Sequence, residues 1–318
     1  MPEKTKPVPV IIDTDPGVDD AIAIMLAEAA PEMELLGLTP VDGNIRAHKT
    51  FSNALALTEM TGASCPVARG AETQLEYPLF IHVGYFIHGF SGTGRLSLPK
   101  TNRAYSDLRA WDFIYKTAKE KKGGLEIIAI APLTNIALTL RKYPDIKPLL
   151  RRITIMGGSI GKGNITRYAE FNFFADPPAA KLVFESGIPI VMAELSTTLK
   201  TAISRRFIKE LGNSGAARAV QLLTGRYFDN TKNKDGERAS VIHDAIPVFY
   251  TAHPEHCETR PALVTIRAER KDKRRGQSVE LPDGEPNVTL ITDIDMRHYE
   301  DFYRNMIAYY QDIMRKRK

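Results

Sequence analysis

The sequence contains little cysteine and no long apolar run, and each absence narrows the class of protein. Cys65 and Cys257 are the two cysteines among 318 residues, too few for a disulfide framework. Polar residues interrupt the apolar runs well short of a membrane span. The first ten residues (MPEKTKPVPV) lack the apolar core of a signal peptide. We therefore expect a cytoplasmic protein that does not enter a membrane.

The chain also lacks a linker rich in proline, glycine or serine, and it has no internal repeat. We expect one domain over residues 1–318, with 1–7 and 314–318 as frayed ends. The formal net charge is +5, and basic residues concentrate at 267–275 and 314–318. Because no nucleic-acid motif accompanies them, we interpret them as a solvated hairpin and terminus and expect no nucleic-acid partner.

Apolar, β-rich segments alternate with segments of helical spacing. Strands are expected at 8–14, 33–41, 125–131, 153–158 and 188–195, and helices at about 18–29, 46–62, 132–144 and 176–187. Two later β-rich segments, 261–270 and 286–295, suggest a hairpin or an antiparallel edge, and 299–318 has the pattern of an amphipathic helix. Repeated βαβ units favour an α/β fold, a mostly parallel central sheet flanked by helices.

Polar clusters follow four of the expected strands, at 13–20, 42–44, 132–135 and 156–159. The carboxyl ends of parallel strands share one edge of the sheet, where open α/β folds hold their ligand crevice. We expect these four segments to meet at one pocket.

Four aspartates lie within eight positions at the first of these clusters: Asp13, Asp15, Asp19 and Asp20. Such crowded carboxylates favour a divalent cation, and Asp15 and Asp20 are candidate ligands. Calcium suits an irregular set of oxygens, whereas zinc would favour histidine and cysteine at spacings that are absent here. The alternative is that Asp19 and Asp20 only cap the following helix, but capping explains one or two of the four.

Two further groups could carry chemistry. Asn164, Glu170 and Asn172 combine amides with a carboxylate, which suits sugar hydroxyls, and an extended backbone would point Glu170 and Asn172 to the same side. His243 and Asp244 are adjacent at the start of an apolar helix, and an imidazole suits proton transfer. Each group alone also has an ordinary structural explanation.

These motifs together resemble the inosine-uridine nucleoside hydrolases. The resemblance runs in order through DTDPGVDDAIAI, DGN, APLTNIA, MGG, AEFNFFADPPAA and HDAIPV, and RRGQSVE and PNVTLITDID resemble the closing segments. It covers about residues 8–313, and D-x-D-P-G-x-D-D is its specific part. The family implies a single-domain, Rossmann-related fold, calcium, and hydrolysis of ribonucleosides to ribose and a free base, as in nucleoside salvage.

The resemblance also implies a role for each matching residue. The calcium ligands would be the side chains of Asp15, Asp20 and Asp244 and the main-chain oxygen of Thr134. The ribose would contact Asp19, Asn44, Met156, Asn164, Glu170 and Asn172. His243 would donate a proton to the leaving base, and His88 would lie beside that base. The family also implies a homodimer or homotetramer.

The chemistry of this set is consistent. Cleavage of the glycosidic bond places positive charge on the ribose, which Glu170 can stabilise. Asp15 can take a proton from the attacking water, whose pKa a bound cation lowers. Asp13 is interpreted as a residue that orients the loop.

Three alternatives remain open at this point. A haloacid-dehalogenase-like phosphatase also begins with a strand and D-x-D, but Pro16-Gly17 stands where Gly-Thr is usual. Phosphate loops at 89–95 or 157–163 depart from the required pattern. A non-catalytic nucleoside-binding protein would bind nucleoside without cleaving it.

Base preference is not readable from the sequence. Residues 224–244 are the expected lid, in which Arg226, Tyr227 and Phe228 could contact the base.

Overall fold

The computed structural model describes residues 6–77, 84–225 and 236–316, and over these residues an eight-stranded sheet organises the chain. Its strands, in spatial order, are β11 (Ser278–Leu281), β10 (Cys257–Ile266), β12 (Val288–Ile294), β7 (Ile190–Ala193), β6 (Leu150–Met156), β5 (Leu125–Ala129), β1 (Val8–Thr14) and β2 (Met33–Pro40). The strands from β12 to β2 are parallel, and β10 and β11 form an antiparallel edge. The predicted mostly parallel, mixed sheet is therefore confirmed.

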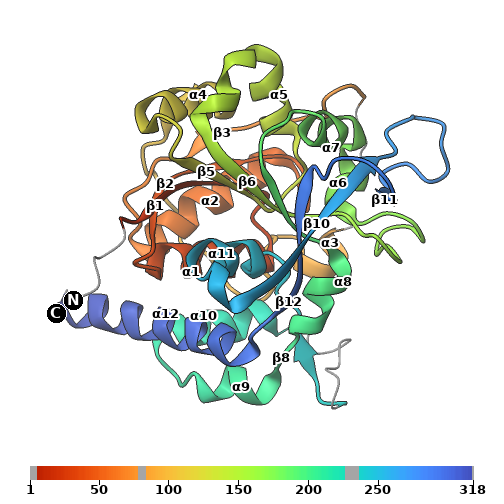
Figure 1. The fold of residues 1–318 in the computed structure, drawn as a ribbon. Helices are drawn as coiled ribbons and strands as arrows, with labels where there is room; N and C mark the ends of the chain where they lie inside the picture. Colours follow the sequence, from red (N-terminus) through yellow and green to blue (C-terminus); the bar gives the residue numbers. More distant parts are fainter. Residues whose placement is uncertain (1–5, 78–83, 226–235, 317–318) are drawn as a thin grey trace.

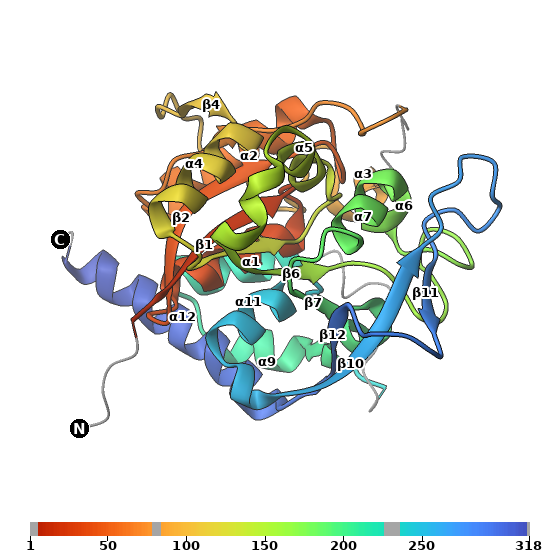
Figure 2. The same cartoon turned by 45° about the horizontal axis from the view of Figure 1, so that its top comes forward.

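Helices cover both faces of this sheet (Figures 1 and 2). On one face lie α4 (Ala110–Lys121), α5 (Thr134–Lys142) and α7 (Pro177–Phe184). On the other lie α1 (Val18–Ala29), α2 (Ala47–Thr61), α10 (Gly215–Thr224), α11 (Ala245–Ala252) and α12 (Met296–Lys316). Four shorter α-helices are α3 (Gly84–His88), α6 (Phe171–Ala175), α8 (Leu195–Thr198) and α9 (Arg205–Glu210). Two pairs of short strands lie outside the main sheet: β3 (Ala68–Arg69) pairs with β4 (Ser106–Arg109), and β8 (Ile203–Ser204) pairs with β9 (Ala239–Ser240).

The alternation of side chains along each strand explains why both faces are covered. In β1, Val10 and Ile12 belong to the apolar cluster under α1, whereas Ile11 belongs to the cluster under α4 and α5. A strand that is buried on both faces needs a continuous apolar run, which β1 and β5 both have.

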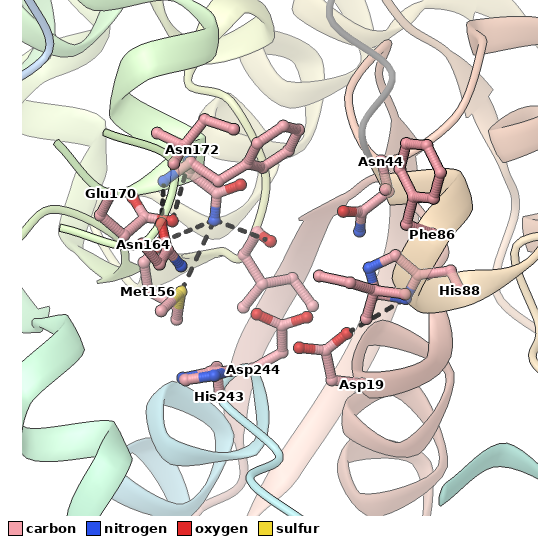
Figure 3. A pocket seen from close by; sticks show the side chains of 15 residues that line it. Asp19, Asn44, Phe86, His88, Met156, Asn164, Glu170, Asn172, His243 and Asp244 are labelled. Carbon is pink, nitrogen blue, oxygen red and sulfur yellow. Dashed lines mark hydrogen bonds and ion pairs between the residues drawn. The ribbon is translucent and has the colours of Figure 1, made fainter. Parts of the chain in front are cut away.

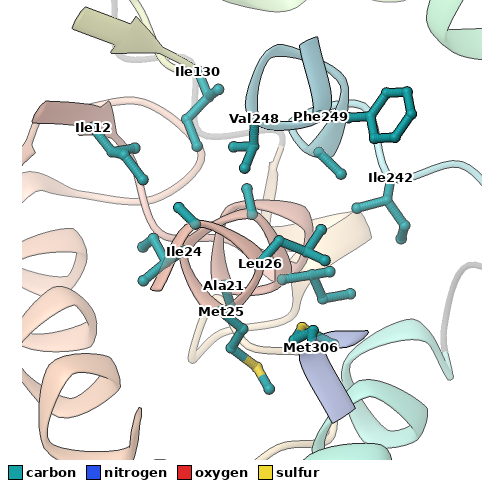
Figure 4. Packing of buried hydrophobic residues seen from close by; sticks show 14 of the residues in the cluster. Ile12, Ala21, Ile24, Met25, Leu26, Ile130, Ile242, Val248, Phe249 and Met306 are labelled. Atoms are coloured by element: carbon teal, nitrogen blue, oxygen red, sulfur yellow. The ribbon is translucent and has the colours of Figure 1, made fainter. Parts of the chain in front are cut away.

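Helix α1 lies deep in the molecule, and its position fixes the loop that precedes it. Residues 18–27 are all buried, and Figure 4 shows Ala21, Ile24 and Leu26 surrounded by apolar side chains from the sheet and other helices. Each fully buried leucine or isoleucine stabilises the fold by about 1.5–3 kcal/mol. The amino end of α1 is therefore held rigidly at the edge of the sheet.

Predicted and observed boundaries agree closely for most elements. The strand predicted at 8–14 is β1, and the helix predicted at 46–62 is α2, whose last turn ends at Gly62 with a positive φ of 79°. The carboxyl terminus differs from the expectation, since α12 continues through Lys316 and 314–316 are helical. Within the described ranges, no helix combines the length and apolarity that crossing a bilayer requires.

Candidate active site

A cavity of about 340 Å³ opens at the carboxyl edge of the parallel strands. Figure 3 shows side chains from distant parts of the chain directed into it. The predicted site residues that line it are Asp19, Asn44, His88, Met156, Asn164, Glu170, Asn172, His243 and Asp244. Three of the four polar clusters predicted to meet, those at 13–20, 42–44 and 156–159, therefore contribute to this cavity, and the cluster at 132–135 does not line it. Asp15 and Asp20 contact Asn44, which lines the cavity, but are not themselves part of its wall.

The loop between β1 and α1 places its aspartates through hydrogen bonds to backbone. Asp20 accepts the Gly17 N–H at 2.9 Å and the Asp15 N–H at 3.0 Å, and it accepts the Thr14 hydroxyl at 2.6 Å. Asp20 thus caps the start of α1, as the structural alternative proposed. Capping does not account for Asp15, Asp19 or Asp244.

Asp15 is fully buried, and its two oxygens differ in their surroundings. Oδ2 accepts the Asn44 N–H at 2.5 Å, whereas Oδ1 has no hydrogen-bond partner among the described residues. A side chain at Gly43 would overlap Asp15 Oδ2, so only glycine allows this approach. An orphaned carboxylate oxygen in the interior is costly unless a cation or water satisfies it.

The acidic side chains gather closely at the base of the cavity. Oxygen atoms of Asp19, Asp20 and Asp244 lie within 4.8 Å of one another. Burial raises the pKa of Asp15, and the charge of Asp20 adds to this rise. Burial likewise raises the pKa of Asp244, with further contributions from Asp19, Asp20 and Asp15.

This donor set fits a hard divalent cation. Buried carboxylates that repel one another favour protonation, whereas a bound cation would favour their charged forms. All the side-chain donors are carboxylate oxygens, the ligand type that calcium and magnesium prefer. Asp15 Oδ1 independently indicates a cation site, because this buried oxygen has no hydrogen-bond donor among the described residues.

Thr134, like Asp15 and Asp20, is a predicted site residue that is not part of the cavity wall. It begins α5, and its hydroxyl donates to Asp176 at 2.6 Å. Ile130 lines the cavity instead, and its main-chain oxygen accepts the Asn172 side-chain amide at 3.4 Å. A main-chain oxygen carries no side-chain pattern, so the sequence offered no direct way to find Ile130.

Asn164, Glu170 and Asn172 line one side of the cavity, but Glu170 and Asn172 do not share the extended segment considered for them, because α6 begins directly after Glu170 and contains Asn172. Glu170 caps α6, where its carboxylate accepts the Asn172 N–H at 2.8 Å, and it also accepts the Gly158 N–H at 2.8 Å. Asn172 lies within α6 and donates to the Met156 main-chain oxygen at 3.1 Å. Burial raises the pKa of Glu170 to about 7, although these N–H groups oppose the rise.

Two histidines also line the cavity, His88 beside Asp19 and His243 on another side, below Met156 in Figure 3. His88 Nδ1 accepts the Val18 N–H at 3.1 Å and lies 3.9 Å from Asp19 Oδ1. His243 Nδ1 lies 2.7 Å from the Thr198 hydroxyl. Burial lowers the pKa of each imidazole to about 4.

Asp13 lies behind the cluster and connects neighbouring elements. Its Oδ1 accepts the Thr39 hydroxyl at 2.6 Å and the Asn135 amide at 2.7 Å. This position suits the orienting role that we predicted for it.

The cavity also has apolar lining residues that the sequence pattern did not reveal. They are Phe86, Ile87, Ile130, Ile165 and Phe171. Phe86 is 88% exposed in spite of its size, and with Ile87 it borders the mouth. An apolar wall beside a polar floor suits a ligand with a flat ring at one end and hydroxyls at the other. Of the lid expected at 224–244, residues 226–235, which include Arg226, Tyr227 and Phe228, lie outside the described residues.

The two phosphate-loop alternatives lack the required context. No helix starts directly after 89–95, and α6 begins eight residues after 157–163. A phosphate loop needs a helix amino terminus at that point.

Comparison with known proteins identifies the family. The model of the inosine-uridine preferring nucleoside hydrolases matches residues 10–301. The pyrimidine-specific ribonucleoside hydrolase RihA of Salmonella paratyphi C is 35% identical over 310 residues, covering 95% of this chain and 99% of RihA. RihA of Shigella boydii is likewise 35% identical over 311 residues, with the same coverage.

Solved structures agree with these sequence matches. The purine-preferring ribonucleoside hydrolase of Gardnerella vaginalis superposes with a TM-score of 0.88 at 29% identity, over 96% of this chain and 99% of that one. A plant nucleoside hydrolase, PpNRh1, gives a TM-score of 0.87 at 27% identity, over 95% and 99%. With an acidic cluster and a polar cavity at the expected edge of the expected sheet, the chain belongs to the inosine-uridine preferring nucleoside hydrolase family, whose members hydrolyse the N-glycosidic bond of ribonucleosides.

Proposed function

We propose that this chain hydrolyses ribonucleosides with the help of one calcium ion. The ligands in this proposal are the carboxylates of Asp15, Asp20 and Asp244, with the main-chain oxygen of Ile130 in place of Thr134. The observations that carry the proposal are the close approach of Asp19, Asp20 and Asp244, whose buried oxygens lie within 4.8 Å of one another, and the buried Asp15 Oδ1, which has no hydrogen-bond partner among the described residues.

The cavity orients the substrate by its polarity. Asp19, Asn44, Asn164, Glu170 and Asn172 provide carboxylate and amide groups for the ribose hydroxyls, and Met156 lies against the sugar. The base would then lie toward the apolar side chains of Phe86 and Ile87, in a cavity that His88 and His243 also line. Relatives are named for pyrimidine and for purine preference, so the proposal concerns ribonucleosides as a class.

The residues of the chain then perform the reaction together. Calcium, when bound, supplies Lewis acidity and coordinates oxygen ligands. Asp15 takes a proton from the water that attacks the anomeric carbon, since Asp15 Oδ1 has no other partner among the described residues. The electron pair of the glycosidic bond leaves on the base, toward which His243 directs an N–H. Glu170 stabilises the positive charge that develops on the ribose.

Replacement of the proposed base tests this scheme. Asp15→Asn should lower kcat by about 10²- to 10⁴-fold, because amides do not accept a proton from water at neutral pH. The exposed Asp301→Asn on α12 is the control and should keep wild-type kcat. Calcium binding by calorimetry on the same variant separates loss of the base from loss of a ligand.

A variant at Asp15 that keeps more than about a tenth of wild-type kcat excludes this residue as the base. A kcat/KM panel over inosine, adenosine, guanosine, uridine and cytidine, with and without chelator, measures substrate range. No release of base from any of the five would instead support the non-catalytic alternative. A cytoplasmic location and a homodimer or homotetramer stay predictions.

A further inference from the structure

The hydroxyl of Thr198 contacts a catalytic candidate but not the cavity. Thr198 is fully buried at the end of α8, and its Oγ1 lies 2.7 Å from His243 Nδ1. Within the described part of the chain, no other hydrogen bond involves the ring nitrogens of His243. If Thr198 is the donor in this hydrogen bond, the neutral ring carries its hydrogen on Nε2, and if Nδ1 is the donor, Nε2 has none. The position of the proton in this bond therefore decides whether Nε2 can donate to a ligand or only accept from it.

Two arrangements of that proton are possible. If Thr198 donates to Nδ1, the neutral ring carries its hydrogen on Nε2 and can donate to a leaving base. If Nδ1 carries the hydrogen and donates to Thr198, Nε2 is a bare acceptor, and the neutral ring cannot assist departure. The second arrangement requires the Thr198 hydroxyl to direct its own proton elsewhere.

The only other acceptor for that proton among the described residues is the Leu195 main-chain oxygen, at 3.1 Å. This oxygen already accepts the Leu199 N–H at the end of α8, so it does not need the hydroxyl proton. The contact with His243 is also shorter by 0.4 Å, from 2.7 and 3.1 Å, and lies at the preferred length for a hydroxyl donor. Both observations favour donation from Thr198 to Nδ1.

His88, which lines the same cavity, provides an internal comparison. Its Nδ1 faces the Val18 backbone N–H at 3.1 Å, and a backbone N–H can only donate. The neutral His88 ring must therefore carry its hydrogen on Nε2. Donation from Thr198 would give His243 the same tautomer, so that both imidazoles present an N–H to the base region of the cavity.

We propose that Thr198 is a positioning residue that holds the neutral His243 ring in the Nε2–H tautomer, so that it can donate a hydrogen bond to the departing base. This inference rests on the proposed function, because it assigns His243 to the leaving group. A neutral imidazole held in one tautomer by a second group is an established way to stabilise developing negative charge.

The kinetic test compares two substrates that differ in their need for such a donor. Thr198→Val removes the hydroxyl and keeps the shape of the side chain. On the best nucleoside of the panel it should lower kcat about 10- to 100-fold, with KM changed less than about threefold. On p-nitrophenyl riboside, whose leaving group needs no donor, kcat should change less than about threefold. Thr198→Ser should restore nucleoside hydrolysis.

Thr197→Val is the matched control. Thr197 is the buried neighbour on the same turn, and its hydroxyl donates to the Ile291 main-chain oxygen at 2.7 Å, away from His243. It loses the same group, so any general effect of removing a buried hydroxyl appears in both variants. An equal loss on both substrates in Thr198→Val, or a Thr198→Ser variant as slow as Thr198→Val, overturns the proposal.

A spectroscopic measurement on the wild-type chain does not depend on how the variants fold. Nitrogen-15 NMR of histidine-labelled protein should show the Nε2–H tautomer for His243, assigned with His243→Asn, and for His88. A hydrogen on Nδ1 of His243 overturns the proposal even if Asp15→Asn behaves as expected. Absence of hydrolysis of either substrate by the wild-type chain rejects the proposed function instead.

Discussion

The acidic residues at the base of the cavity are held in their positions by groups that do not neutralise them. Asp20 is satisfied by backbone N–H groups, whereas Asp15 keeps one buried oxygen without a partner among the described residues. Folding places these carboxylates together at a cost, because burial and mutual repulsion both oppose their charged forms. A bound cation would offset that cost, and the free energy of unfolding would then depend on the concentration of the metal ion.

Glu170 gives a prediction for the pH dependence of stability. Burial raises its pKa from the ordinary 4.5 to about 7, so between these values the folded chain holds a proton that the unfolded chain releases. The free energy of unfolding contributed by this group therefore falls as pH rises through that window. Between pH 4.5 and 7.5, the free energy of unfolding of the chelator-treated wild type should therefore fall by about 3 kcal/mol relative to that of Glu170→Gln. Urea denaturation of both proteins at each pH measures this difference.

The comparison uses the difference between two proteins, so titrations that both share cancel. Glu170 accepts the Asn172 N–H on Oε1 and the Gly158 N–H on Oε2, whereas glutamine keeps one acceptor oxygen, so a constant offset in stability is expected but no slope with pH. Parallel stability curves for the two proteins, or a wild type that gains stability with pH relative to the variant, would contradict the assigned shift.

Residues whose role depends on a side chain were largely predictable from the sequence, and those that act through the backbone were not. The density of Asp15, Asp19 and Asp20 along the chain is enough by itself to indicate a cation. In our proposal the ligand from this segment is the main-chain oxygen of Ile130, which no residue type marks, whereas the sequence pattern pointed to Thr134 four residues later.

At the scale of elements, the site depends on how the loops at the carboxyl edge are tied to one another. Asn135, in the first turn of α5, donates to Asp13 Oδ1 at 2.7 Å and to the Thr39 main-chain oxygen at 3.1 Å. Its own oxygen accepts the Ala71 N–H at 2.8 Å. One buried amide thus joins α5, β1, β2 and the segment after β3.

Removal of this amide should destabilise the fold markedly. Asn135→Ala removes its hydrogen bonds to the Ala71 N–H, the Thr39 main-chain oxygen and Asp13 Oδ1, although Asp13 Oδ1 keeps the Thr39 hydroxyl as a donor. A buried polar group left without a partner costs about 1–3 kcal/mol. We expect a loss of about 3 kcal/mol in the free energy of unfolding, measured by urea denaturation. The exposed Asn305→Ala on α12 should change stability by less than about 0.5 kcal/mol. Similar losses in the two variants would show that Asn135 does not connect these elements.

Helices and strands with a clear hydrophobic pattern were predictable from the sequence, and short elements were not. The apolar run of β1 and the glycine that ends α2 gave boundaries accurate to within one residue. Helix α6 has only five residues, and its start depends on the Glu170 cap rather than on an apolar stripe. The sequence therefore predicted that Glu170 and Asn172 face one cavity, which they do, but not that Asn172 lies in a helix.

At the scale of the whole molecule, one sheet edge unites contributions from nearly the entire chain. Site residues run from Asp15 to Asp244, and the family match covers residues 10–301. The resemblance to ribonucleoside hydrolases extends over 95% of the chain at 35% identity. Residues that are far apart in the sequence therefore line one cavity at this edge of the sheet.

The central claim, a catalytic calcium held by the amino-terminal aspartates, is tested most directly by one titration. Chelator-stripped protein is titrated with calcium while heat of binding and nucleoside hydrolysis are followed on the same samples. We predict one ion bound per chain and a kcat that rises in proportion to the occupied fraction from below about a hundredth of its final value. Full activity in stripped protein, or binding that leaves kcat unchanged, would contradict the claim.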